Sequence, residues 1–75
     1  MSLGSGSIMS GNSITQGYRL IRLDEVRDIV GLSRATIYRF IKQGDFPKQI
    51  SLGGRAVAWD EREVFDWVEQ RLMLR

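Results

Sequence analysis

Residues 24–44, DEVRDIVGLSRATIYRFIKQG, decide the fold of this chain. Asp24 offers an N-terminal cap for a short first helix, and Gly31 supplies the positive φ that ends it. Ser33 is a good cap for a second helix, which Gly44 ends. The apolar stripes are Val26, Ile29 and Val30 in the first helix and Ile37, Phe40 and Ile41 in the second. Two short helices joined by about three residues form the outline of a helix-turn-helix, although plain helical packing units share it.

Alternating apolar residues on both sides of this stretch predict strands. Residues 48–59 predict a hairpin, in which two alternating runs flank Gly53 and Gly54. These glycines accept the positive φ values of a tight reversal, and Arg55 follows them at the tip. Residues 19–23 alternate in the same way and predict a further short strand. A hairpin beside the second helix of a helix-turn-helix is a wing.

A last helix follows the hairpin and runs to about Leu72. Asp60 is its predicted cap, with Glu63 as the reciprocal partner of a capping box. Its core face is formed by Val64, Trp67, Val68 and Leu72. We assign Trp59 and Trp67 to the core and Phe46 and Pro47 to the packing under the wing.

The predicted fold class is therefore mainly α with a small β-hairpin wing, a winged helix-turn-helix of three helices over residues 18–75. Residues 1–17 carry no charge and consist mostly of Ser, Gly and small polar residues, so we expect a flexible tail. Its first eight residues are consistent with an appended, non-native segment.

The composition argues against an enzyme. Seventy-five residues form one small domain with little room for a deep pocket. The chain has no Cys and no His, which removes thiol nucleophiles, the commonest general base and soft-ligand zinc sites. We expect no catalytic residue, no metal, no cofactor and no small-molecule substrate. The apolar residues are scattered, so we also expect neither a membrane span nor a secretory signal.

Charge is distributed unevenly along the chain, although the net charge is only +2. Residues 31–59 carry five cations and one carboxylate, Asp45, whereas residues 60–75 carry three cations and five carboxylates. A polyanion would be attracted to the middle of the chain and repelled by the last helix.

Four segments, RLIRLDEV, GLSRATIYRFIKQGDFPK, LGGRAVAW and DEREVFDWV, cover most of residues 19–68 in order. As a set they resemble the AlpA-type phage regulatory proteins, small relatives of the phage excisionases and of the MerR-like DNA-binding domain. Members of the family often carry a second proline where this chain has Gln49, which affects the start of the first wing strand. The resemblance implies a winged helix-turn-helix that binds prophage DNA. It would promote excision by an integrase, activate transcription of the integrase gene, or both.

Side-chain chemistry assigns roles in binding double-stranded DNA. Arg39 lies opposite Ile37 on the second helix, and its guanidinium can bond to guanine O6 and N7 together. Arg55 at the wing tip is suited to a narrow, A·T-rich minor groove, which the resemblance to excisionases also suggests. The predicted contacts are Ser33, Arg34, Ala35, Thr36, Tyr38, Arg39 and Lys42 in the recognition helix and Lys48, Gly53, Gly54 and Arg55 in the wing.

Several of these residues have a second interpretation. Ser33, Arg34, Thr36 and both lysines suit phosphate contacts, but Arg34 and Lys42 are equally explained as solvated helix positions. The ring of Tyr38 either touches DNA or covers the apolar surface of the hairpin.

An alternative function is a protein-interaction adaptor that uses the last helix, where Phe65, Met73 and Leu74 exceed the needs of one core stripe. An RNA target is disfavoured, since no glycine-aromatic platform or Gly-x-x-Gly clamp is present. One small domain reads few base pairs, so we expect a monomer or weak dimer that self-associates on DNA, with a phage integrase as a further partner. The resemblance implies a bacterial cytoplasmic, nucleoid-associated protein.

Overall fold

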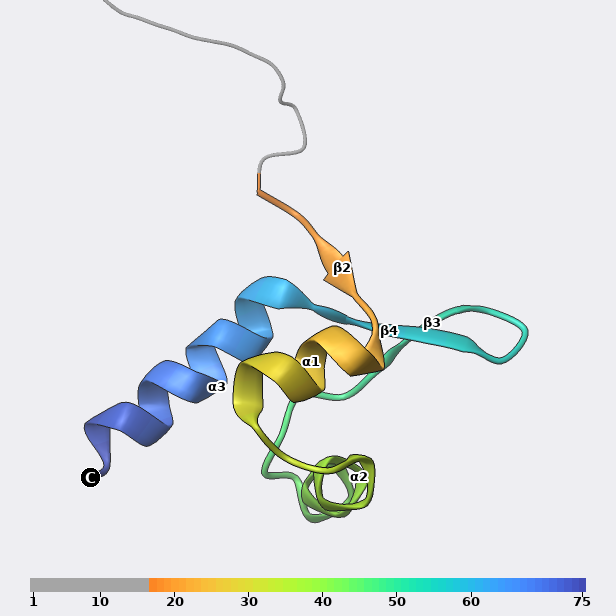
Figure 1. The fold of residues 1–75 in the computed structure, drawn as a ribbon. Coiled ribbons are helices and arrows are strands. Elements are labelled where there is room, and N and C mark those ends of the chain that lie inside the picture. Colours follow the sequence, from red (N-terminus) through yellow and green to blue (C-terminus); the bar gives the residue numbers. More distant parts are fainter. Residues whose placement is uncertain (1–16) are drawn as a thin grey trace, which may run out of the picture.

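The computed structural model describes residues 17–75, drawn in colour in Figure 1. The elements are β2 (Leu20–Ile21), α1 (Leu23–Val30), α2 (Arg34–Gln43), β3 (Ile50–Gly53), β4 (Ala56–Asp60) and α3 (Glu61–Met73). Three helices and an antiparallel hairpin confirm the predicted winged helix-turn-helix. The predicted flexible tail lies outside the described residues, apart from Gly17.

A small antiparallel sheet with the order β2-β4-β3 connects the wing to the helices. β4 is central: Ile21 pairs with Trp59 on one side, and Ile50 pairs with Ala58 on the other. The ladder of β3 is irregular between Ser51 and Gly53. The hairpin of β3 and β4 projects from the helices at the right of Figure 1, while α3 continues from β4 toward the left.

The turn between α1 and α2 is formed as the sequence predicts. Gly31 has a φ of 72°, and its N–H donates to the carbonyl of Arg27 at 2.8 Å. Only glycine adopts this conformation without strain, so the chain turns here instead of continuing α1. Ser33 caps α2, because its Oγ accepts a hydrogen bond from the Thr36 N–H at 3.2 Å.

The predicted cap of α1 is wrong. The helix starts at Leu23, and Arg22 occupies the cap position without a side-chain hydrogen bond. Val26 N–H already donates to the Arg22 carbonyl at 3.0 Å, so the helix starts before Asp24 can cap it. Asp24 instead lies in the first turn, where its negative charge interacts favourably with the helix dipole.

Two further local predictions need correction. The residues at the turn of the wing are Gly54 and Arg55, since Gly53 still pairs with Ala56. The reversal therefore lies one residue later than predicted, and it includes Arg55. Asp60 caps α3, but its Oδ1 accepts from the Arg62 N–H at 2.9 Å. The cap is thus made one residue before the Glu63 position that a capping box requires.

The core lies where β2, β4 and the three helices meet. Its buried residues are Ile21, Val26, Ile37, Phe46, Trp59 and Val64. Trp59 is 0% exposed, as predicted, whereas Trp67 is half-buried and packs against the edge of this cluster. Burying a side chain as large as Trp59 contributes several kcal/mol, so β4 anchors the fold.

Both tryptophans also hold the segment that connects α2 to β3. The Trp59 Nε1–H donates to the Pro47 carbonyl at 3.1 Å, and the Trp67 Nε1–H donates to the Asp45 carbonyl at 2.6 Å. Phe46 lies between these two points with its ring centroid 5.0 Å from that of Trp67. It therefore packs toward α3, not only under the wing as predicted. These contacts fix the wing relative to the end of α2.

Candidate nucleic-acid interface

The outer face of α2 carries the predicted recognition residues. Ile37 is 0% exposed and faces the core. Arg34, Ala35, Arg39 and Lys42 are exposed, whereas Thr36 and Tyr38 are half-buried. Helical periodicity therefore predicted the exposed face of α2 correctly. Because Ala35 has no side chain beyond Cβ, the wall of a DNA groove could approach the backbone of α2 closely at this position.

Two hydroxyl groups are coupled at the start of α2. Ser33 Oγ donates to Thr36 Oγ1 at 3.0 Å and accepts from the Thr36 N–H. This pair occupies the hydroxyl hydrogen of Ser33, but Thr36 keeps its own hydroxyl hydrogen as a donor. The first N–H groups of a helix also lack partners within it. The start of α2 therefore offers hydrogen-bond donors suited to a phosphate.

Tyr38 connects α2 to the wing strand. Its ring meets that of Trp59 edge to face, with centroids 6.2 Å apart and planes at 71°. The guanidinium carbon of Arg34 lies 5.2 Å from the Tyr38 ring centroid. This packing favours the structural interpretation of Tyr38. It also restrains Arg34 through a cation–π contact, which a freely solvated arginine would lack.

The wing presents a second cationic point. Arg55 and Lys48 are both exposed, one in the turn and the other in the segment before β3. Gly53 and Gly54, with φ values of 113° and 55°, allow the chain to reverse around Arg55. The tip lies well apart from α2 in Figure 1, so helix and wing form two separate patches.

Ion pairing distinguishes these cations from Arg19 and Arg62. Hydrogen bonds to Glu61 and Glu25, and their negative charges, raise the pKa of Arg19. The pKa of Arg62 is raised by a hydrogen bond with Tyr18, over whose ring the guanidinium carbon lies at 4.1 Å, and by Asp60. The cations without a salt bridge to any residue of 17–75 include Arg34, Arg39, Lys42, Lys48 and Arg55. They remain available to an external anion.

Sequence reasoning missed two features of the surface. Ile50 and Leu52 share one face of β3, yet they are 37% and 47% exposed. A groove also separates the segment after α2 from α3. Neither feature has a local sequence signal, because each depends on how distant elements pack.

Comparison with known proteins agrees with this arrangement. The sequence model of the family described as "Prophage CP4-57 regulatory protein (AlpA)" matches residues 19–72. The chain belongs to the AlpA family. Its match extends from the residue before β2 to the last turn of α3, so it includes the helix-turn-helix and the wing.

Two curated relatives extend the comparison within the AlpA family. An uncharacterized protein, ORF88 of Enterobacteria phage P4, is 50% identical over 54 residues, which are 72% of this chain and 61% of the phage protein. The DNA-binding transcriptional activator AlpA of Escherichia coli K12 is 37% identical over an alignment of 62 residues that covers 75% of this chain and 89% of that protein. The chain thus spans less than two thirds of the phage relative.

Residues 17–75 contain no group of three or more His, Cys, Asp or Glu side chains that could hold a metal ion. None of their helices has the length and apolar character needed to cross a bilayer.

Proposed function

We propose that this protein is a sequence-specific regulator of prophage origin that binds double-stranded DNA. The observation that carries the proposal is the exposed face of α2, on which Arg39 and Lys42 lie opposite buried Ile37, with exposed Arg34 in the first turn. None of these three cations has a salt bridge within residues 17–75. Membership of the AlpA family supports it, as does similarity to the transcriptional activator of E. coli.

In the proposed complex α2 enters the major groove. Arg39 reads a guanine, and the Thr36 hydroxyl with the first N–H groups of α2 binds phosphate. Arg34, stacked on Tyr38, is held near the backbone of the same duplex. The wing directs Arg55 into the adjacent minor groove, where a narrow, A·T-rich segment has a more negative potential. Lys42 and Lys48 add contacts that strengthen binding on any sequence.

The regulated process is transcription of an integrase gene, excision of a prophage by the integrase, or both. In either case the protein binds DNA as several copies and contacts a phage integrase there. In solution it is a monomer or a weak dimer. It acts at the nucleoid in the bacterial cytoplasm, and it performs no catalysis of its own.

Selection from a random pool of duplexes, followed by titration of the enriched site at two salt concentrations, tests the proposal. We expect a short motif and an affinity that falls steeply between about 50 and 200 mM salt, because counterions are released from the phosphates. Absence of enrichment together with absence of binding at low salt would contradict DNA recognition.

A protein-interaction adaptor is the second candidate function. It is favoured by the exposure of Phe65 (45%), Met73 (84%) and Leu74 (77%) on and beyond α3. Binding through these apolar residues would change little with salt, so the same titration, repeated with a protein ligand, separates the two functions.

A further inference from the structure

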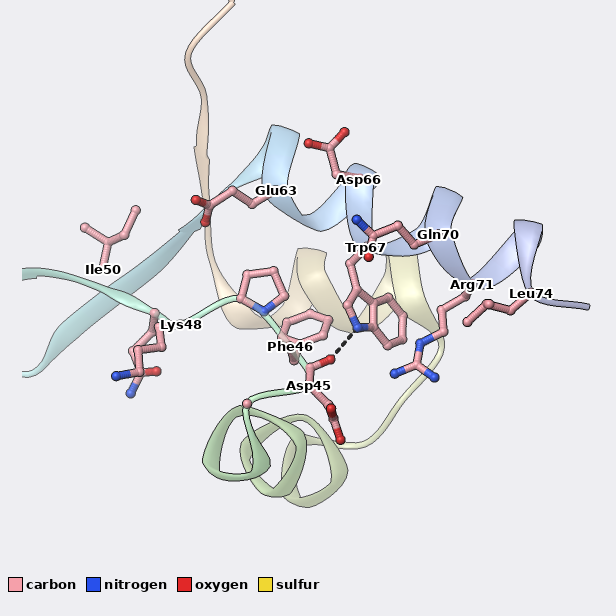
Figure 2. Close-up of a pocket in the computed structure, with 13 residues that line it drawn as sticks. Asp45, Phe46, Lys48, Ile50, Glu63, Asp66, Trp67, Gln70, Arg71 and Leu74 are labelled. Atoms are coloured by element: carbon pink, nitrogen blue, oxygen red, sulfur yellow. Dashed lines mark hydrogen bonds between the residues drawn. The ribbon is translucent and has the colours of Figure 1, made fainter.

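A groove of about 810 Å³ runs between α3 and the segment that connects α2 to β3 (Figure 2). We call it the α3 groove. Its walls are formed by residues 44–50 on one side and by one face of α3 on the other. The residues from α3 and its end are Glu63, Asp66, Trp67, Gln70, Arg71 and Leu74. Their spacing of three or four residues makes them a continuous stripe along the helix.

The α3 groove contains apolar surface between its polar parts. Phe46 and Trp67 meet there, and Ile50 and Leu74 contribute exposed apolar surface at the two ends. Apolar surface of this kind is stabilised when a second helix covers it.

The charges along the stripe change sign from one end to the other. Its first half carries Glu63 and Asp66, and its second half carries Arg71. Neither carboxylate forms a salt bridge within residues 17–75. The guanidinium carbon of Arg71 lies 4.7 Å from the Trp67 ring centroid, so its charge is held beside this apolar surface. A second stripe that ran the opposite way would complement both halves.

We propose that the α3 groove binds α3 of a second copy of this chain, with the two helices antiparallel. A two-fold axis between positions 68 and 69 places Asp66 opposite Arg71 of the second copy and Trp67 opposite its Gln70. Leu74 then lies opposite Glu63 of the second copy, so that its apolar side chain is covered beside the aliphatic part of that residue. Under this symmetry every contact occurs twice. A parallel arrangement would instead oppose like charges.

This inference specifies the self-association part of the proposed function and names its surface. The dimer does not depend on DNA recognition, because the α3 groove uses no residue of the exposed face of α2. A monomer could still bind DNA through α2. Lys48 belongs both to the α3 groove and to the predicted DNA contacts, so the dimer interface borders the DNA-binding surface. The test is made without DNA, and its failure would leave the DNA-binding proposal intact.

Sedimentation equilibrium of the full chain over a wide range of concentrations tests the dimer. We expect a reversible dimer that Asp66→Lys and Arg71→Glu each weaken by about tenfold, since each change makes two opposed pairs repulsive. An equimolar mixture of the two variants should associate like the wild type, because each supplies the charge that the other needs. The double variant should also recover.

Glu69→Lys is the matched control, because Glu69 is an exposed carboxylate of α3 outside the groove. It should dimerise like the wild type. Circular dichroism checks that each variant is folded. If Arg71→Glu is unstable, Asp66→Lys still tests the interface, because it replaces an exposed residue. A wild type that stays monomeric would overturn the proposal. Failure of the double variant to recover, or equal weakening by Glu69→Lys, would also overturn it.

Discussion

Helices α2 and α3 satisfy the same packing requirements and differ on the surface that they expose. Each starts at a side-chain cap, Ser33 or Asp60, and each has a single fully buried residue, Ile37 or Val64. The outer face of α2 carries cations, whereas the first turn of α3 carries Glu61 and Glu63. The packing requirement therefore constrains the inner faces of both helices alike and leaves the charges of their outer faces free to differ.

The first turn of α2 departs from the arrangement that stabilises a helix. The N-terminal end of the helix dipole is positive, so carboxylates are favoured there, and α3 follows that rule. The first turn of α2 has no acidic residue and carries Arg34 instead. The cation–π contact with Tyr38 offsets part of this unfavourable charge, and departures from local stabilising rules are expected chiefly at functional positions. The departure supports a role for this end of α2 in binding an anion.

Breaking the core that both helices share should have the largest effect. Trp59→Ala removes the largest fully buried side chain and should lower the free energy of unfolding by about 3 to 5 kcal/mol. Urea denaturation followed by circular dichroism measures the loss. A variant that remains as stable as the wild type but no longer binds DNA would mean that Trp59 serves the interface rather than the core.

Arg39 tests whether the outer face of α2 reads sequence. Arg39→Ala should weaken binding to the selected site by about 1 to 3 kcal/mol and binding to random DNA much less. Arg39→Lys is the matched control, because it keeps the charge but loses the two parallel hydrogen bonds of the guanidinium. Equal losses on both kinds of DNA would reduce Arg39 to a phosphate contact.

The wing should contribute less than the helix. Arg55→Ala is expected to reduce affinity by about 1 kcal/mol when the flanking minor groove is A·T-rich, and by less when it is G·C-rich. Competition between two duplexes that differ only in this flank measures the difference. If the variant and the wild type discriminate the flanks equally, the wing tip does not enter the minor groove.

The smallest expected effect concerns the different charges in the first turns of α2 and α3. Arg34→Glu gives α2 the acidic start that α3 has and loses the contact with Tyr38. The net change in stability should be within about 0.5 kcal/mol of zero, since the dipole and cation–π effects oppose each other. Affinity for DNA should nevertheless fall. Thermal unfolding and a binding titration of one preparation measure both, and unchanged affinity would contradict the role of Arg34.

Local signals predicted α2 more accurately than its neighbours. Ser33 and Gly44 mark its ends by side-chain and backbone chemistry that acts within one turn, so its boundaries followed from the sequence. α1 begins without a side-chain cap, and Asp24 was misread because it stands where a cap could be. The turn of the wing lies one residue later than predicted, because two successive glycines do not show which of them still pairs with the opposite strand.

The sequence predicted only those features of the candidate site that lie on one face of one helix. The exposure of Arg39 and Lys42 follows from helical periodicity. The edge-to-face packing of Tyr38 on Trp59 depends on how α2 meets β4, 21 positions later in the chain. The α3 groove likewise needs α3 beside the segment after α2. Contacts between distant elements set these features, and no short pattern encodes them.

The two indole hydrogen bonds have a consequence for how this domain can evolve. Trp59 and Trp67 donate to carbonyl groups of the main chain at residues 47 and 45, not to side chains. Every amino acid offers the same carbonyl, so mutations at these two positions leave both acceptors in place. Positions 45 and 47 can therefore change their side chains, and with them the rim of the α3 groove, while buried Phe46 between them stays constrained and the wing stays in position.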